Sequence, residues 1–186
     1  MKPEIYISVD IEASGPIPGE YSMLSLGAAV VGSISKRFYA ELKPITPNHV
    51  PKAVEICGLS LEKLMKEGEE PGAAMSRFEQ WIKEMAGEAK PVFVGFNATF
   101  DWGFVNYYFH RFLGRNPFGI SGLDIKAYYM GMKGCSWGET AKARMDKEFL
   151  SGKKHTHKAV DDAVEQAEIM EKLFKNNNSQ TDKKGL

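Results

Sequence analysis

The stretch "ISVDIEASG" at residues 7–15 constrains the chain most, because it joins an apolar alternation to two closely spaced acids. Residues 4–12 are rich in Ile, Val and Tyr and alternate as a β-strand does. Side chains two apart in a strand share a face, so Asp10 and Glu12 project together. Such carboxylates repel each other unless a positive charge lies between them. A strand end in solvent would also tolerate the pair, and the motif alone is weak.

A second acid follows another apolar run. Residues 90–97, "KPVFVGFN", are apolar on both faces and are typical of a central strand. Asn97 ends this run, and Asp101 follows four residues later, early in an aromatic-rich helix expected over residues 99–113. The dipole of that helix favours an acid in its first turn, which gives Asp101 an ordinary structural explanation.

The third acidic motif lies near the C-terminus, in "HTHKAVDDAVEQAE", residues 155–168. His157 precedes Asp162 by five residues, and Asp162 stands at the start of a helix expected over residues 159–175. An acid at a helix start with a histidine in the preceding loop is again a simple alternative explanation.

The rest of the pattern predicts further strands and helices in alternation. Besides the segments above, we expect two strands at residues 22–32 and 36–44 that continue a meander, and a short strand at residues 120–125. We also expect an amphipathic helix at residues 72–86 and a helix that begins with a capping box at residues 136–139. This order indicates one α/β domain over residues 1–175, with a mixed sheet and helices on its faces. Residues 176–186 are polar and aperiodic, and we expect a mobile tail there.

Composition limits the partners. The formal net charge is zero, so no global field attracts nucleic acid or an anionic membrane, and a polyanion would have to be held by metals or a local basic patch. Cys57 and Cys135 fit no metal motif and are expected to be reduced thiols. The N-terminus lacks the apolar run of a signal peptide, and no segment is long and apolar enough to span a membrane. A cytoplasmic protein is expected.

Taken together and in this order, the three acidic motifs resemble those of the DEDDh family of 3′-to-5′ exonucleases, which includes the proofreading subunits of bacterial DNA polymerases, ribonuclease T and oligoribonuclease. The residues that carry the resemblance are Asp10, Glu12 and Gly15, then Asn97 and Asp101, then His157 and Asp162. It extends over about residues 4–172 and is weakest over residues 126–150. It implies a ribonuclease H-like fold: a mixed five-stranded sheet, its first three strands an antiparallel meander, with helices on both faces.

The resemblance also implies roles. Asp10, Glu12, Asp101 and Asp162 would bind two divalent ions, Mg²⁺ or Mn²⁺, which prefer carboxylate oxygens and can stabilise the charge that builds on a phosphodiester. Asp10 would bridge the ions. Glu12 and Asp162 would hold the ion on the side of the attacking water, and Asp101 would support the other. His157 would be the general base, since an unperturbed imidazole titrates near neutrality.

The third motif offers alternatives. His155 could be the base instead of His157, and Asp161 could be the ligand instead of Asp162. The five-residue spacing of the family selects His157 and Asp162. Asp161 would then be an exposed acid at the helix start.

Contacts with the substrate follow less directly. By resemblance, the backbone at Ala13 and Ser14 approaches the 3′-OH of the terminal nucleotide, and Asn97 and Phe100 lie beside terminal nucleotides. Phe100 could stack on a base or simply pack in the core. Residues 142–158 carry six Lys and Arg against two acids, which could follow phosphates or be a solvated helix face.

The leading function is a metal-dependent exonuclease that releases nucleoside 5′-monophosphates from the 3′ end of single-stranded DNA or RNA. One alternative is a hydrolase of dinucleotides or very short oligonucleotides. The other is a nucleic-acid-binding module that keeps the fold without catalysis, against which the complete set of acids and the histidine argues. A homodimer, which some relatives form, is compatible with the sequence.

Overall fold

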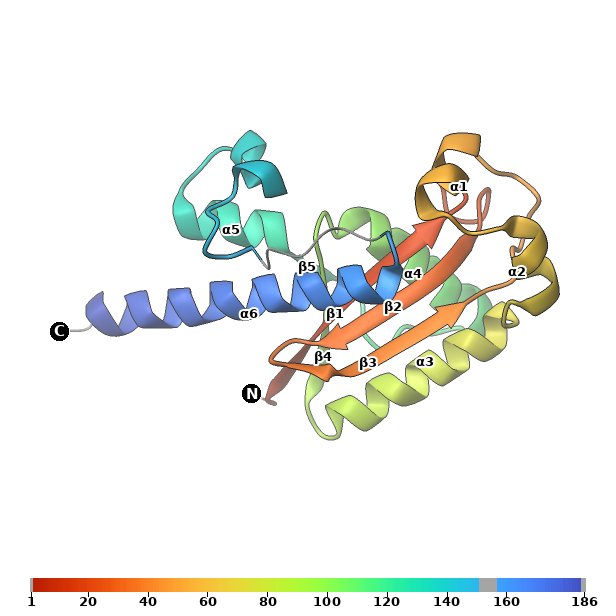
Figure 1. Cartoon of the computed structure of the whole chain (residues 1–186). Helices are drawn as coiled ribbons and strands as arrows, with labels where there is room; N and C mark the ends of the chain where they lie inside the picture. The colour runs from red at the N-terminus through yellow and green to blue at the C-terminus, as the bar shows by residue number, and fades with distance from the viewer. Residues whose placement is uncertain (1, 151–156, 185–186) are drawn as a thin grey trace.

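Five strands form one mixed sheet with the order β3-β2-β1-β4-β5 (Figure 1). The computed structural model describes residues 2–150 and 157–184. β1 pairs antiparallel with β2, and β2 with β3, whereas β4 runs parallel to β1 and β5 parallel to β4. The strands are β1 Glu4–Ala13, β2 Met23–Val30, β3 Ser33–Glu41, β4 Lys90–Gly95 and β5 Gly122–Asp124. The predicted mixed sheet with its antiparallel meander is therefore confirmed.

Helices cover both faces of the sheet. The long final helix α6 crosses one face over β1 and β2, and α3 and α4 pack together on the other (Figure 1). The helices are α1 Pro51–Cys57, α2 Leu61–Glu67, α3 Pro71–Ala86, α4 Thr99–Leu113, α5 Ile125–Lys133 and α6 Ala159–Lys184, with short 3₁₀ turns η1 Trp137–Thr140 and η2 Lys142–Arg144. Within the described ranges, none of these helices is long and apolar enough to cross a membrane.

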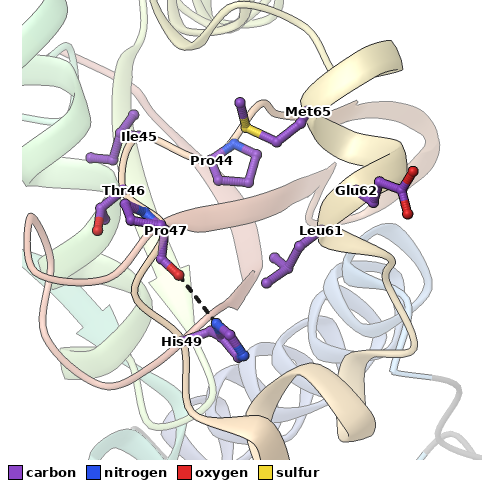
Figure 2. A pocket seen from close by; sticks show the side chains of 8 residues that line it. All are labelled: Pro44, Ile45, Thr46, Pro47, His49, Leu61, Glu62 and Met65. Atoms are coloured by element: carbon purple, nitrogen blue, oxygen red, sulfur yellow. Dashed lines mark hydrogen bonds between the residues drawn. The ribbon is translucent and has the colours of Figure 1, made fainter.

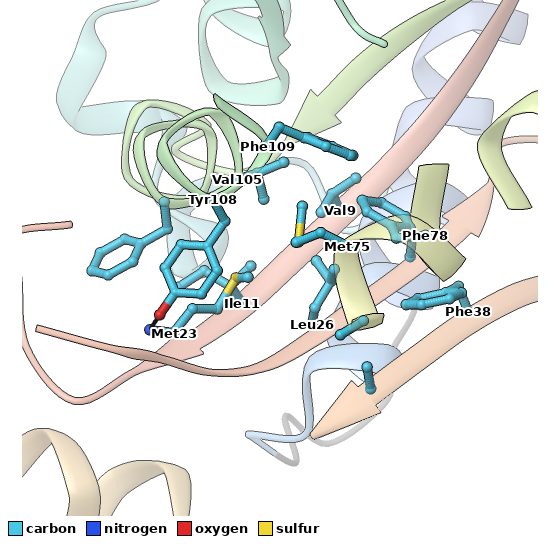
Figure 3. Close-up of a cluster of buried hydrophobic side chains, with 14 of the residues drawn as sticks. Val9, Ile11, Met23, Leu26, Phe38, Met75, Phe78, Val105, Tyr108 and Phe109 are labelled. Atoms are coloured by element: carbon cyan, nitrogen blue, oxygen red, sulfur yellow. Dashed lines mark hydrogen bonds between the residues drawn. The ribbon is translucent and has the colours of Figure 1, made fainter. Parts of the chain in front are cut away.

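The alternation of apolar and polar side chains along β1 gives the strand one face buried in the core and one polar face. Ile7, Val9 and Ile11 are buried in the main core, among the aromatic side chains that α3 and α4 supply (Figure 3). The hydroxyl of the buried Tyr108 in this core accepts a hydrogen bond from the backbone N–H of Met23 at 2.8 Å. This face fixes the register of β1, and the opposite face consequently presents Asp10 and Glu12.

Gly27 lets α6 lie directly on the polar face. It pairs with Asp10 across the β1–β2 ladder, and therefore shares that face. A Cβ at Gly27 would lie 2.2 Å from the carbonyl carbon of Ala159, the first residue of α6. Only a residue without a side chain permits this approach, so Gly27 sets how close the start of α6 comes to β1.

Replacing Gly27 with Ala is therefore expected to lower stability sharply. The new methyl group meets backbone atoms that cannot rotate away, and overpacking of this kind costs up to about 3 kcal/mol. For a chain of this size that corresponds to a fall in Tm of about 6–12 °C, measurable by differential scanning fluorimetry. Gly131→Ala, where no atom lies within 4 Å of the added Cβ, is the matched control and should leave Tm unchanged or slightly raised. Equal melting of the two variants would contradict the close approach.

Two boundaries differ from the sequence-based expectation. The helix expected to end at residue 175 continues to Lys184, so residues 176–184 are helical rather than an aperiodic tail. No glycine or proline occurs in that stretch, and the first such residue is Gly185. The capping box at Ser136 and Glu139 exists, but it opens the short turn η1 instead of a longer helix, since Ala141 is already extended.

Candidate active site

The four acids of the sequence motifs meet in one place. Asp10 and Glu12 from the end of β1, Asp101 from α4 and Asp162 from α6 line a single cavity of about 410 Å³. Each segment carrying them is far from the others in the sequence, yet the parallel pairing of β1 with β4 and the crossing of α6 bring them together. Whatever their role, these acids form one cluster.

Helix starts and burial explain how the cluster is held. Asp101 and Asp162 both stand in the first turn of their helix, where the dipole favours a negative charge. The backbone N–H of Ile11 donates to Oδ1 of Asp101 at 3.0 Å and so ties α4 to β1. Asp101 is 5% exposed and Asp162 2%, which excludes solvent-facing acids as the explanation of these motifs.

Burial and mutual repulsion raise the pKa values of these carboxyls. The pKa of Asp10 lies well above its usual range, first through desolvation and then through the charges of Asp101, Asp162 and Glu12. Burial, with the charges of Asp162 and Asp101, raises the pKa of Glu12 to about 7. Burial likewise raises the pKa of Asp101 to about 7, although the hydrogen bond from the backbone N–H of Ile11 acts to lower this pKa. The site therefore gathers carboxyls that repel one another when ionised, and a bound cation would stabilise their ionised forms.

The stability of the metal-free protein is expected to fall as pH rises from about 4.5 to 7. Over this interval Glu12 is protonated in the folded state and ionised in the unfolded state, so the folded state binds more protons and rising pH favours unfolding. The measurement is Tm against pH in EDTA, repeated in Mg²⁺, which should raise Tm more at pH 8 than at pH 5. A metal effect that is the same at both pH values would contradict repulsion among these acids.

His157 completes the cluster from the loop before α6. One ligand atom from each of Glu12, His157 and Asp162 lies within 4.8 Å of the others. The backbone of His157 has a φ of 54°, a left-handed conformation that costs energy in any residue with a side chain and often marks a functional position. His155 lies outside the described residues, and Asp161 is exposed while Asp162 is buried. Asp162 is thus the acid of the third motif that faces the cavity.

The donor set suits a hard divalent cation. Four carboxylates and one imidazole converge, without any thiolate, and oxygen ligands of this kind favour Mg²⁺ or Mn²⁺ over softer metals. The raised pKa values of Asp10 and Glu12 also favour a metal site, because these carboxyls ionise fully only when a bound cation supplies positive charge. The residues present therefore fit a metal site.

The predicted substrate contacts divide into two pairs. Asn97 and Phe100 line the cavity, and the ring of Phe100 is 38% exposed, so it is not a core side chain. Ala13 and Ser14 do not line it. The N–H of Ser14 donates to Ser22 at 2.8 Å, and the Ser14 carbonyl accepts from Val50 at 2.7 Å. The geometry therefore gives no support to a nucleotide contact by the backbone of Ser14.

Two polar residues of the cavity, Gln166 and Lys142, were not predicted as site residues from the sequence. Gln166 is 3% exposed; its Nε2 donates to Oδ1 of Asp10 at 2.7 Å, and its Oε1 accepts from the N–H of Phe96 at 2.9 Å. Its position four residues after Asp162, on the same helix face, was the available signal. Lys142 enters the cavity from η2 and could be suspected only as one member of a basic stretch.

A second cavity of about 410 Å³ lies apart from the acids, between the loop after β3 and α2 (Figure 2). Its lining is mainly apolar, from Pro44, Ile45, Pro47, Leu61 and Met65. Glu62 is the only acid among its lining residues, and its carboxylate points away from the others (Figure 2), so this cavity lacks the ligands that the acidic cavity gathers.

Comparison with known proteins agrees with this site. Residues 7–170 match the exonuclease family RNase_T. The chain is 50% identical over 173 residues to the 3′-5′ DNA exonuclease Cap18 of Escherichia coli, covering 92% of both chains. Its fold is similar to the nuclease domain of 3′hExo, a DEDDh family member bound to rAMP (TM-score 0.73, 14% identity, 92% of both chains). It is also similar to E. coli exonuclease I bound to a dT13 oligonucleotide (TM-score 0.70, 20% identity, 96% of this chain and 42% of that one).

The chain therefore belongs to the RNase_T family of exonucleases. It is a metal-dependent 3′-5′ exonuclease with the α/β fold of the DEDDh enzymes. The two structural likenesses, at under 25% identity, bear on the fold alone.

Proposed function

We propose that this exonuclease removes nucleoside 5′-monophosphates one at a time from the 3′ end of single-stranded DNA, with two divalent ions, Mg²⁺ or Mn²⁺, in the acidic cavity. The observation that carries the proposal is the convergence of four acids and His157 on one cavity. Among the described residues that line the cavity, Lys142 is the only cation beside four acids, and phosphodiester cleavage is the chemistry that such a site serves.

The acids are assigned by position. One ligand atom from each of Glu12, Asp162 and His157 lies close to the others, so Glu12 and Asp162 would hold a cation beside the histidine that would activate the attacking water. Asp10 lines the same cavity and interacts electrostatically with Asp101, Asp162 and Glu12, so it would help to hold both ions. When bound, the ions stabilise the charge that develops on the phosphate oxygens.

His157 is assigned as the general base. It accepts a proton from the water that attacks the terminal phosphorus; the P–O3′ bond then breaks, and the leaving 3′-oxygen of the shortened strand takes a proton from solvent. The exposure of His157 suits this role, because a base must return its proton to solvent after each turnover. Phe100 offers an open aromatic face on which a base can stack.

DNA and a single-stranded end are the favoured substrate because the 50%-identical relative is a DNA exonuclease and exonuclease I was solved with a dT13 oligonucleotide. The test uses 5′-labelled DNA and RNA oligonucleotides of several lengths, single-stranded and duplex, with Mg²⁺, Mn²⁺ or EDTA. We expect a ladder that shortens from the 3′ end of single-stranded DNA and disappears in EDTA. Activity confined to the shortest oligomers would instead support a dinucleotide hydrolase, and binding without cleavage would support a silent module.

Gln166→Leu is expected to weaken metal use without unfolding the protein. The two hydrogen bonds of Gln166 fix the rotation of the Asp10 carboxylate, and losing such a partner typically costs 10–100-fold in metal affinity or activity, here about 30-fold in the Mg²⁺ concentration for half-maximal activity. Saturating Mg²⁺ should recover most of kcat. Gln80→Leu, an exposed glutamine on α3, is the control and should leave the Mg²⁺ titration unchanged. An unchanged titration for Gln166→Leu would show that Asp10 needs no such support.

A further inference from the structure

The acidic cavity contains one basic side chain. Among the described residues that line it, Lys142 is the only cation beside Asp10, Glu12, Asp101 and Asp162. It comes from the stretch 126–150, which matches the exonuclease pattern least in sequence. A cation placed among metal-binding acids would compete with the metals unless it serves something else in the cavity.

The chain on either side holds Lys142 in place. Thr140, two residues before it, is fully buried, and its hydroxyl donates to the carbonyl of Trp137 at 2.7 Å. Met145, three residues after it, is buried in a cluster with Ile169 and Met170 of α6. Lys142 therefore stands on a segment packed against the last helix, with its position determined by the fold.

The ammonium group is aimed by two contacts. Nζ of Lys142 donates to Oε2 of Glu165 at 2.7 Å, three residues after Asp162 on α6. It also lies 5.2 Å from the centre of the Phe96 ring. Glu165 takes one N–H of an ammonium that has three, so the group remains able to bind a further anion.

Lys142 and His157 lie on opposite sides of the acids. His157 borders a small cavity with Ser25 and Tyr39, from β2 and β3, whereas Lys142 lies with Phe96 at the end of β4. In the sheet, β2 and β4 flank β1 on its two sides. An in-line displacement puts the attacking water and the leaving oxygen on opposite sides of phosphorus. With the water on the His157 side, the departing strand lies on the Lys142 side.

We propose that Lys142 binds the phosphate of the penultimate nucleotide, the one next to the scissile phosphodiester, and so holds the strand that remains after each cleavage. This rests on the proposed function, because it takes the direction of attack from His157. The ligand class is a nucleic acid with at least two consecutive phosphates. In the free protein the carboxylate of Glu165 accepts one hydrogen bond from the ammonium group of Lys142. When nucleic acid is bound, the phosphate accepts a second hydrogen bond from the same group.

The test compares Lys142→Met with Lys36→Met, an exposed lysine on β3 that does not line the acidic cavity. We expect Lys142→Met to raise KM for single-stranded DNA about tenfold at low salt, with kcat changed less than about threefold, and to reduce the slope of log KM against log salt by about 0.7, the value for one lost phosphate contact. Lys142→Arg should restore most of both, and Lys36→Met should change neither.

Binding measured by anisotropy with a 5′-labelled oligonucleotide in Ca²⁺ separates this proposal from the proposed function. Loss of affinity in Lys142→Met, even if the wild-type protein cleaved nothing, would support the phosphate contact while the exonuclease assignment failed. Normal cleavage with KM and salt slope unaffected by Lys142→Met would overturn the contact alone. A fall in kcat and Tm without a change in KM would also overturn it, and would leave Lys142 as a tether between η2 and α6.

Discussion

Asp10→Asn is expected to reduce kcat by at least about 10³-fold while it makes the metal-free protein more stable. Asp10 lies at the centre of the acid cluster, and loss of metal-based charge stabilisation worth several kcal/mol corresponds to this factor. Stability should rise because Asn removes a carboxyl whose ionisation in the folded state is opposed by burial and by the charges of Asp101, Asp162 and Glu12. A gain of about 1 kcal/mol would raise Tm in EDTA by about 2–4 °C.

The opposite signs of these two effects make the experiment decisive. A substitution that damages the fold lowers both activity and Tm, so loss of activity with a higher Tm identifies a charge kept for function. Asp161→Asn is the matched control, one residue before Asp162 but exposed, and should leave kcat within about twofold, because exposed changes away from a site are usually small. If Asp10→Asn kept a tenth or more of the activity, Asp10 would not be a metal ligand.

His157→Asn is expected to lower kcat about 10²–10⁴-fold, the usual contribution of general base catalysis, with little change in Tm. Asn is chosen because, among residues with a side chain, it tolerates the left-handed backbone of His157 well, yet its amide accepts no proton at neutral pH. The rise of Tm on adding Mg²⁺ should persist, since the four carboxylates remain. Steady-state kinetics and melting curves on the same preparation measure both.

His110→Ala, on the exposed end of α4, controls for the loss of an imidazole and should be fully active. Loss of the Mg²⁺-induced rise of Tm in His157→Asn would reassign His157 as a metal ligand, since it shares a ligand cluster with Glu12 and Asp162. Activity close to that of the wild type would remove His157 from the mechanism.

Periodicity predicted the order of strands and helices, whereas the five-stranded arrangement and the meeting of the four acids followed from the resemblance of the three motifs to the DEDDh exonucleases. The alternation of Ile7, Val9 and Ile11 assigned one face of β1 to the core, and this alone placed Asp10 and Glu12 on the other. Helix starts at Thr99 and Ala159 followed from the apolar periods, so Asp101 and Asp162 fell in first turns as expected.

Contacts made only by tertiary packing could not be predicted in the same way. Gln166 is one of several polar residues on α6, and its bond to Asp10 depends on how closely α6 approaches β1. Gly27 permits α6 to lie this close to β1. A glycine in a strand, however, does not indicate from sequence alone which part of the backbone will pack against it. Lys142 depends on the packing of η2 on α6, in the stretch without a recognisable pattern.

The last of the four acids stands on the last helix, and this has a consequence for synthesis. A chain emerging from the ribosome displays Asp10 and Glu12 first, but the cavity lacks a wall until Asp162 has emerged and α6 has settled against Gly27. A partly made polypeptide can therefore neither gather the ligands nor place the base. Exonuclease activity is therefore expected only once the final helix has packed on the sheet, and a chain that ends before α6 should lack it.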